Sequence, residues 1–495
     1  MRQLTSLDAQ FLHFESATAV GHVGALVLVD PSTAPGGALT LDDLRAVLEP
    51  RLHLAPPLRQ RLVDVPFGLA RPYWVDDPDF DLEFHLREIA LPGDGDDRQL
   101  GEHVARIHAR PLDRRRPLWE MYLIHDVAGG RSALYGKVHH AAIDGVSGAE
   151  VIATVMDFTP EPREVEPPEQ PWDPAPLPSW AERVSRALTG AVRHPAMLAR
   201  TVPQALPHVV DLPGAANIPG VKLLSDVSSG VAKLLGHEPP SDVLRRPLTT
   251  PRTPLNAPIT AHRRLAFGAL SLDEVKRVKN AFDLTVNDVV MTLCAAALRR
   301  WLLDHDGLPA IPIVAAVPVS VRTEDQRGAN GNRVSVMLAE MPTHLAEARD
   351  RLMFVRDSMQ AAKRQFEAVP ATILQDLSAV LPTALNGLAA RSLFRLVSAP
   401  GPPFNLFVSN VPGPQQPLYV AGARVLGVYP MSAISDLTGA LNITLFSYDG
   451  DLDFGLIACR ELLPDVWHLI DYLRDALAEL LALPEVSETT AAPPL

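Results

Sequence analysis

Two adjacent histidines are the residues best placed to do chemistry, in the stretch "LYGKVHHAAIDGVSG" (residues 134–148). His139 and His140 end an apolar run and form the only adjacent pair among sixteen histidines. Asp144 and Gly145 follow the pair after a spacer of three residues. An imidazole titrates near neutral pH and can take a proton from a reacting group, and glycine permits a tight turn. The pattern predicts a general base at the end of a strand, with a carboxylate fixing the loop behind it.

The same spacing argues against a metal site. Neighbouring residues of a strand point to opposite faces. If the strand runs through both His139 and His140, only one imidazole faces a given cavity, whereas a metal needs converging ligands. The alternative is that both histidines are satisfied interior residues and that Asp144 caps the helix predicted over residues 146–158. The HH-x3-DG unit as a whole favours the functional interpretation, and we expect no metal.

Composition and charge narrow the class of protein. The 495 residues exceed one ordinary core, so we expect two or more domains. A hydrophobic content of 47% suits a globular fold, and a net charge of -13 argues against nucleic-acid binding. Cys294 and Cys459 lie far apart and are expected to be buried thiols. The sequence shows neither a secretion signal nor about 18 uncharged apolar residues in a row, so we expect no membrane-spanning helix.

Strand and helix patterns mix along the chain and predict an α/β fold. In the N-terminal part, strands are expected over residues 22–30 and 131–140. Helices are expected after Thr40 as N-cap and over residues 98–113. In the C-terminal part, long helices are expected over residues 272–305 and 345–366, with a final helix over residues 464–482. Further strands are expected at "IPIVAAVPVSV", "VSVMLAEM", "NLFVSNV", "GALNITLFSY" and "LDFGLIAC".

Proline content divides the chain into two similar halves. Residues 1–158 form the first predicted lobe, and a proline-rich, partly helical connector spans residues 159–258. Residues 259–484 form the second lobe, and residues 485–495 are expected to be a flexible tail. Within the connector, residues 183–210 hold four arginines and no acidic residue. That composition suits an interfacial helix on anionic lipid, or a connector packed on protein.

The histidine motif and the segments around it resemble the bacterial wax ester synthase/diacylglycerol acyltransferase family. This family belongs to the HH-x3-DG superfamily of CoA-dependent acyltransferases, which includes chloramphenicol acetyltransferase and condensation domains. The resemblance covers nearly the whole chain outside the connector and the tail. It rests on "HHAAIDG", "LDAQFLHFES", "GHVGAL", "RPLDRRRPLWEMYLI", "NDVVMTLCAAALRRWL", "VPVSVR", "GNRVSVMLAEMP", "SNVPGP" and "LNITLFSYDGDLDFGL". It implies two chloramphenicol-acetyltransferase-like lobes whose substrates meet in a tunnel between them.

The resemblance also implies the reaction and the role of each site residue. A long-chain acyl group would pass from acyl-CoA, a substrate and not a cofactor, to diacylglycerol or a long-chain alcohol. His140 would be the general base, and no acyl-enzyme is required because CoA thiolate leaves readily. His139 and Asp144 are counted with His140 among the catalytic-site residues. Gly145 and Arg322 would support the site, with Arg322 as the candidate ion-pair partner of Asp144. Arg322 is otherwise a solvated arginine after a strand.

Two further residues have competing interpretations. Asn287, in the family's Asn-Asp element, would donate to the oxyanion, or it is the N-cap of a helix. Trp119, in the Pro-Leu-Trp element, would line the acyl tunnel, or it belongs to the core. Asn410 is expected to serve a turn before Pro412. The arginines of "RPLDRRRPL" could meet CoA phosphates, although a charge run is usually a solvated face.

The implied substrates are lipids, so we expect a cytoplasmic protein that associates peripherally with membrane or lipid inclusions. No nucleic-acid partner is expected, and the sequence does not indicate the oligomeric state. Two rival functions are acyl transfer from a carrier protein and a non-catalytic scaffold of the same fold on storage lipid. A serine hydrolase is excluded because no G-x-S-x-G element occurs. Nucleotide and nicotinamide chemistry are unlikely because no P-loop or G-x-G-x-x-G element occurs.

Overall fold

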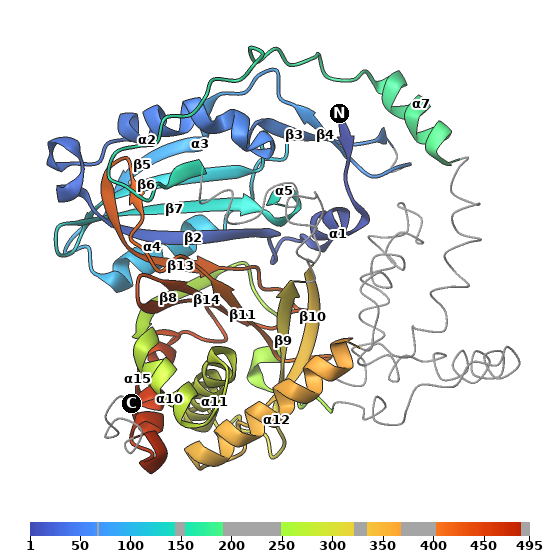
Figure 1. The fold of residues 1–495 in the computed structure, drawn as a ribbon. Helices are drawn as coiled ribbons and strands as arrows, with labels where there is room; N and C mark the ends of the chain where they lie inside the picture. The colour runs from blue at the N-terminus through green and yellow to red at the C-terminus, as the bar shows by residue number, and fades with distance from the viewer. Residues whose placement is uncertain (67–68, 144–153, 192–248, 321–333, 368–401, 487–495) are drawn as a thin grey trace, which may run out of the picture.

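The computed structural model describes residues 1–66, 69–143, 154–191, 249–320, 334–367 and 402–486. Two α/β lobes lie against each other, the first built mainly from the N-terminal part of the chain (blue to teal) and the second from the C-terminal part (yellow-green to red; Figure 1). Among the described residues, each lobe has a six-stranded sheet. A three-stranded sheet of β1 (Arg2–Gln3), β4 (Tyr73–Asp76) and β3 (Gln60–Val63) accompanies the first lobe. The predicted α/β class is confirmed.

The sheet of the first lobe has the order β12-β13-β2-β7-β6-β5. Strand β2 shows why these residues form a two-faced sheet, because its apolar side chains alternate. Leu26 and Leu28 face one core, whereas Val27 and Val29 face another. The pairs are antiparallel except for β5 with β6. The bounds are β2 His22–Asp30, β5 Leu86–Ala90, β6 Trp119–Val127, β7 Arg131–His139, β12 Tyr419–Val420 and β13 Ala423–Met431.

Two strands of this sheet come from the far end of the chain. Strand β13 pairs antiparallel with β2, with Val428 opposite Val27 and Tyr429 opposite Leu26. The sequence patterns predicted β2 and, with one residue too many, β7, but they did not single out β13 as a strand. A register shift between Val425 and Gly427 interrupts the pairing and marks a bulge. The first lobe is therefore completed by residues that follow most of the second lobe in sequence.

The sheet of the second lobe has the order β10-β9-β11-β14-β15-β8. Strand β11 is parallel to both of its neighbours, and the other pairs are antiparallel. The five strands predicted in this half are confirmed to within a few residues, and β8 is an additional strand at the edge. The bounds are β8 Arg263–Ser271, β9 Ile313–Ser320, β10 Val334–Met341, β11 Leu406–Pro412, β14 Leu441–Tyr448 and β15 Asp451–Cys459.

The helix expected over residues 272–305 is in fact two helices, α10 (Leu272–Ala281) and α11 (Val286–Asp304). The chain turns at Asp283, whose φ is 51°, and Thr285 then begins α11 with a capping box to Asp288. The apolar periodicity of the sequence continues across this break, which is why the sequence predicted one helix in place of α10 and α11. The other longer helices are α1 Ser6–Phe14, α2 Leu41–Leu48 with Thr40 as its predicted N-cap, α4 Asp97–His108, α12 Ala348–Glu367 and α15 Trp467–Leu481.

Helix α4 lies between the lobes and joins their cores. Leu100 and Val104 belong to one apolar cluster with Leu26 of β2, Leu265 of β8 and Leu298 of α11. The helix can approach β8 closely because a Cβ at Gly101 would lie 2.8 Å from the Leu265 carbonyl oxygen. A second cluster covers the other face of the first sheet. The lobes therefore share one continuous core.

The remaining described elements are helix α7 and several elements of three to six residues. They include α3 (Leu82–His85), α5 (His140–Ile143), α7 (Trp180–Ala191) and 3-10 turns at Pro31–Thr33, Pro35–Gly37, Glu49–Leu54, Pro56–Arg59 and Pro254–Asn256. Residues 146–153 of the helix predicted over residues 146–158, and residues 192–210 of the 183–210 segment, lie outside the described residues. Of residues 154–158, only Thr154 and Val155 are helical, and Asp157 forms an isolated bridge with Tyr419, so the predicted helix extends too far. In the described part of the chain, no single helix has the length and apolarity to cross a membrane. The pair α10 and α11, bent by 104°, together meets that test.

Candidate active site

The two histidines stand at the point where strand β7 becomes helix α5. The strand ends at His139, and His140 is the first residue of the helix. The strand was expected to run through both residues, and the structure ends it one residue earlier. Because His140 is helical and His139 is the last residue of the strand, the directions of the two imidazoles do not follow from strand alternation. His139 is buried and His140 is partly exposed.

His139 is held at both ring nitrogens. Its Nδ1 accepts a hydrogen bond from the main-chain N–H of Ala141 at 3.1 Å, and its Nε2 lies 3.2 Å from Oε1 of Glu15. A nitrogen that accepts from an N–H carries no proton, so the ring proton of His139 sits on Nε2 and points at the carboxylate. His139 is therefore oriented by a hydrogen-bond partner on each side.

Glu15 follows helix α1 and is fixed by three groups. Its Oε1 accepts from the main-chain N–H of Gly21 at 2.9 Å, and its Oε2 accepts from Nε and Nη2 of Arg114 at 3.2 and 2.5 Å. Burial opposes ionisation of Glu15, but its contacts with His139, Arg114 and Gly21 outweigh burial and lower the pKa to about 2. Glu15 is therefore a carboxylate at any pH near neutrality.

His140 packs against helix α1 and is uncharged at neutral pH. The Phe11 ring stacks on its imidazole with centroids 3.9 Å apart. Burial and the neighbouring His139 lower its pKa to about 4, against the opposing effect of a hydrogen bond with its own backbone. Its main-chain N–H donates to the Gly21 carbonyl at 2.9 Å. An uncharged, partly exposed imidazole at a fixed position can accept a proton.

A chain of buried polar groups continues beneath His139. His22 lies opposite His139 on β2, and its Nε2 donates to the His108 carbonyl at 2.6 Å. Nδ1 of His108 lies 2.7 Å from the Tyr135 hydroxyl. Burial holds the pKa of His22 well below its ordinary value and lowers that of His108 to about 3. The histidines under the pair are thus neutral and serve the packing.

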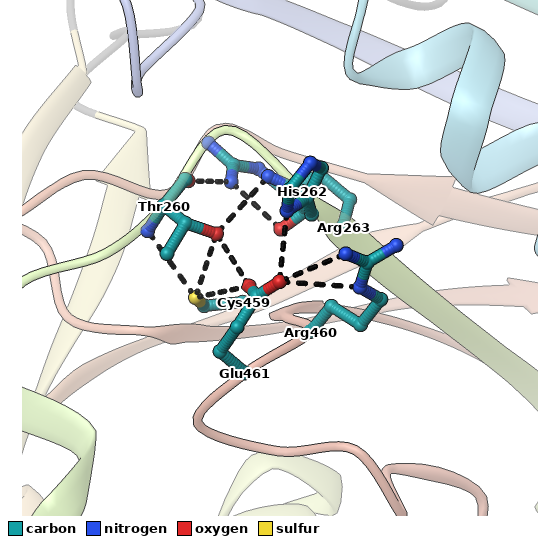
Figure 2. A network of polar contacts seen from close by, with 6 residues as sticks. All are labelled: Thr260, His262, Arg263, Cys459, Arg460 and Glu461. Carbon is teal, nitrogen blue, oxygen red and sulfur yellow. Dashed lines mark hydrogen bonds and ion pairs between the residues drawn. The ribbon is translucent and has the colours of Figure 1, made fainter.

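Arg263 ties the second lobe to the loop that leads into the histidine site. This buried side chain donates to the carbonyls of Thr260 and His262, and also to that of Thr18 in the first lobe. Figure 2 shows the surrounding cluster, in which Glu461 accepts from Thr260 and contacts His262. Cys459 is also part of this cluster, and both Cys459 and Cys294 are buried free thiols, as expected. Through the bond from Arg263 to Thr18, the cluster joins the two lobes at a point three residues before Gly21.

Asn287 lies in the first turn of α11 but is not its N-cap. Thr285 is the N-cap and accepts from the Asp288 main-chain N–H at 3.2 Å, so the capping alternative for Asn287 is wrong. The side chain of Asn287 is partly exposed, and its Oδ1 lies 3.5 Å from Nδ2 of Asn410. Asn410 belongs to strand β11 and not to a turn, which corrects that expectation as well. The structure pairs the two asparagines.

Trp119 is buried in the core of the first lobe. Its indole stacks on His85 with centroids 4.5 Å apart, and its Nε1 donates to the Leu58 carbonyl at 2.8 Å. The arginines of "RPLDRRRPL" also contact protein groups, because Arg115 binds Asp113 and Arg116 lies over the Phe84 ring. Asp144, Gly145 and Arg322 lie outside the described residues, so their predicted roles stay predictions.

Comparison with protein families identifies the chain. Residues 4–290 match the wax ester synthase/diacylglycerol acyltransferase catalytic domain, and residues 330–481 match the C-terminal domain of the same family. The chain belongs to this family. Its histidine pair lies inside the part that matches the catalytic domain, and its enzyme class is that of the family's O-acyltransferases.

Relatives of this wax ester synthase/diacylglycerol acyltransferase chain match it over nearly its full length. The O-acyltransferase WSD of Acinetobacter baylyi is 32% identical over 488 residues, which are 96% of each chain. A Mycobacterium tuberculosis H37Rv protein, provisionally named a diacylglycerol O-acyltransferase, is 36% identical over 491 residues, 97% of this chain and 90% of the relative.

Solved structures confirm the predicted two-lobed fold. The wax ester synthase/diacylglycerol acyltransferase from Marinobacter aquaeolei VT8 superposes with a TM-score of 0.65 at 32% identity, over 97% of this chain and 98% of that one. The first condensation domain of the calcium-dependent antibiotic synthetase shares the fold, with a TM-score of 0.54 at 19% identity over 99% and 98% of the two chains.

Three residues around the histidine pair were not predicted as parts of the site. Phe11 and Glu15 lie in the segment "LDAQFLHFES", and Gly21 begins "GHVGAL", so all three stand in stretches that carry the family resemblance. Nothing local in those stretches indicates contact with a motif more than a hundred residues later. The one available signal is the residue type of Glu15, because a carboxylate is a common orienting partner of a histidine. That signal does not say which histidine Glu15 contacts.

Proposed function

We propose that this family member transfers a long-chain acyl group from acyl-CoA to the hydroxyl of diacylglycerol or of a long-chain alcohol. The observation that carries the proposal is His140, a partly exposed imidazole whose lowered pKa keeps it uncharged at neutral pH. The names of full-length relatives supply the substrate class.

The proposed reaction is one direct displacement. The acceptor hydroxyl attacks the thioester carbon while His140 takes the hydroxyl proton, because an alcohol alone is a poor nucleophile at neutral pH. The new carbon–oxygen bond forms first and gives a tetrahedral oxyanion, and the carbon–sulfur bond breaks when the carbonyl is restored. CoA leaves as a thiolate, which recovers the proton that His140 accepted. No covalent enzyme intermediate is needed.

The negative charge on the thioester oxygen needs a hydrogen-bond donor during attack. Asn287 is our candidate, because an amide donates without titrating and its side chain is partly exposed at the start of α11. The contact between its Oδ1 and Asn410 would leave the amide N–H groups of Asn287 directed elsewhere. Loss of one such donor typically lowers the rate about 100- to 1000-fold.

The first test is thiol release from palmitoyl-CoA with product analysis, using dioleoylglycerol and hexadecanol as separate acceptors. Wild type is expected to release thiol only with an acceptor, and His140→Ala is expected to lose that release. His125→Ala is the matched control, because His125 pairs with Glu88 on the exposed side of the same lobe. Equal activity of wild type and His140→Ala would contradict the proposed base. No release from wild type with either acceptor would contradict the acyl-CoA reaction.

The proposal extends to where the enzyme works, at a membrane or lipid-inclusion surface. Three large apolar side chains, Trp172, Leu177 and Trp180, are exposed by 39%, 38% and 55% around the start of α7. Helix α7 also carries Arg183 and Arg186, and it lies at the periphery of the first lobe (Figure 1). Exposed tryptophans beside arginines suit the interface of an anionic bilayer.

Flotation with vesicles of phosphatidylglycerol and phosphatidylcholine tests this surface. Wild type is expected to float with the vesicles, and the double variant Trp172→Ala/Trp180→Ala is expected to float several-fold less. Leu303→Ala is the control, because Leu303 is an apolar side chain of the second lobe that is 49% exposed. An unchanged bound fraction in the tryptophan variant would show that this region is not the lipid contact.

A further inference from the structure

One carboxylate, that of Glu15, contacts both His139 and the residue that binds the main chain of His140. Oε1 of Glu15 accepts from the main chain of Gly21 and faces Nε2 of His139, while Oε2 is bound by Arg114. Gly21 in turn accepts the main-chain N–H of His140. We propose that Glu15 is the positioning residue of the histidine pair, holding His139 and Gly21 so that His140 stays aimed at the reacting groups. This inference rests on the proposed role of His140.

The first argument is how Glu15 reaches the backbone of helix α5. The early main-chain N–H groups of a helix have no partner within it and are satisfied from outside. In α5 these partners are the Gly21 carbonyl for His140 and the imidazole of His139 for Ala141. Both partners are bound to Glu15. A shift of the Glu15 carboxylate is therefore expected to shift the first turn of α5, which carries the His140 side chain.

The second argument concerns the tautomer of His139. Because Nδ1 accepts from Ala141, Nε2 must donate, and only an acceptor at residue 15 suits it. His139 and Gly21 share Oε1 of Glu15, whereas Arg114 binds Oε2. A glutamine in place of Glu15 could therefore offer its amide oxygen either to His139 and Gly21 or to Arg114, and its amide N–H groups would face the other donors. The carboxylate has no N–H to misplace. A carboxylate that fixes the tautomer and orientation of a histidine in this way is a common device in catalytic and metal sites.

The third argument is that Glu15 is itself rigid. Arg114 binds it through two nitrogens, and Nη2 of Arg114 also donates to the Leu12 carbonyl at the end of α1 at 2.9 Å. The carboxyl group is mostly shielded, with 16% of its side chain exposed. A partner that is held on its far side can orient a histidine, whereas a mobile surface glutamate could not.

A structural role for Glu15, limited to tying α1 to Arg114, predicts a different outcome from a positioning role. The structural role would lower the midpoint of thermal unfolding and the amount of folded enzyme, but it would leave the turnover of each folded molecule unchanged. The positioning role lowers kcat with little change in the KM for acyl-CoA. It also makes the effect of Glu15 depend on His139.

The experiment measures kcat and KM for palmitoyl-CoA in wild type, Glu15→Gln, His139→Ala and the double variant. Glu15→Gln is expected to lower kcat about 10- to 100-fold, the usual effect of removing a histidine's orienting partner, with KM within about twofold. In the His139→Ala background, Glu15→Gln is expected to add little, because the two residues act through one contact. Glu15→Asp keeps the charge and is expected to fall between wild type and Glu15→Gln.

Glu88→Gln is the matched control, because Glu88 also pairs with a histidine, His125 at 2.7 Å, but away from the site. It should leave kcat unchanged. The inference is overturned if Glu15→Gln keeps wild-type kcat, or if its effect multiplies fully with that of His139→Ala. If Glu15→Gln does not fold, Glu15→Asp takes its place. The inference is then overturned by wild-type kcat in Glu15→Asp, or by a loss of kcat in Glu15→Asp that multiplies fully with that of His139→Ala. His140→Ala, assayed alongside, separates the two proposals. An inactive His140→Ala beside a fully active Glu15→Gln refutes the positioning role alone.

Discussion

The Phe11 ring lies parallel to the His140 imidazole, with 3.9 Å between centroids and 14° between planes. One face of the imidazole is therefore covered by an apolar ring in place of water. A charged imidazolium loses more than a neutral imidazole when water is removed, so this contact favours the uncharged form. The stack links helix α1 to the protonation state of the proposed base.

The pH dependence of kcat/KM should report this stack. With a His140 pKa of about 4, the wild-type value should be constant across neutral pH and fall only as the pH drops through about 4. Phe11→Ala lets water reach the ring, so the pKa should rise toward the ordinary 6.5 and the acid limb should move to higher pH. Activity at pH 5 should then fall more than activity at pH 8. Coincident acid limbs in Phe11→Ala and wild type would refute this explanation.

Gly21→Ala should reduce turnover because the site has no room for a side chain. A Cβ there would lie 2.7 Å from Nε2 of His139 and 3.0 Å from the Phe11 carbonyl oxygen. Displacing His139 should lower kcat about tenfold or more, since sub-ångström errors in a catalytic arrangement are costly. Gly136→Ala is the control on the same sheet, because its Cβ would meet nothing within 4 Å. Similar kcat values for the two variants would contradict the prediction.

Arg51→Met should destabilise the first lobe by leaving the buried Asp157 without its nearest charged partner, so that only the more distant Arg163, at 3.9 Å, remains. Nη2 of Arg51 lies 2.8 Å from Oδ2 of Asp157, and both side chains are nearly inaccessible, at 1% and 4%. Breaking one side of such a pair typically costs about 3–5 kcal/mol. Chemical denaturation measures it, and Arg45→Met, which removes a partly exposed arginine, should cost less than about 1 kcal/mol. Equal effects would show that the buried pair is not a major contributor.

Asp453→Asn should stabilise the protein increasingly as the pH rises toward about 8. Asp453 is buried on β15 and accepts the Val428 main-chain N–H beside the bulge of β13. Burial raises its pKa to about 7 from 3.8, so the folded state resists losing this proton. Wild-type stability therefore declines between about pH 4 and pH 7, while the amide, which also accepts a hydrogen bond, is unaffected. Thermal unfolding at pH 5 and pH 8 measures the difference, and a constant difference would contradict the prediction.

Local signals made part of the fold predictable. Strand β2 was predicted with its observed bounds because its apolar residues are continuous and β-branched, and Thr40 was predicted as the N-cap of α2 because it precedes a helical pattern. Strand β13 was missed because its sequence "ARVLGVYPM" contains Gly427 and Pro430, both unfavourable within a strand. Its partner lies about 400 residues earlier, and no local pattern records such pairing.

The candidate active site was also predictable only in part. His139 and His140 were predicted because a short motif carries them, and the end of β7 was placed to within one residue. Asn287 was considered as an N-cap because of its residue type, but the cap is Thr285, which stands two residues earlier and is also a favoured capping residue. Phe11, Glu15 and Gly21 act on the pair through contacts that only the folded chain creates.

Strand β13 also constrains how the protein is made. The edge of β2 that receives it leaves the ribosome roughly 400 residues before Met431 does, a delay of about 20–80 s at about 5–20 residues per second. During that interval the nascent first lobe presents an unpaired apolar strand edge, the kind of surface on which chains associate wrongly. Expressing residues 1–158 alone would make this exposure permanent. Linking residues 419–431 to that fragment would supply the missing edge, and solubility would show the difference.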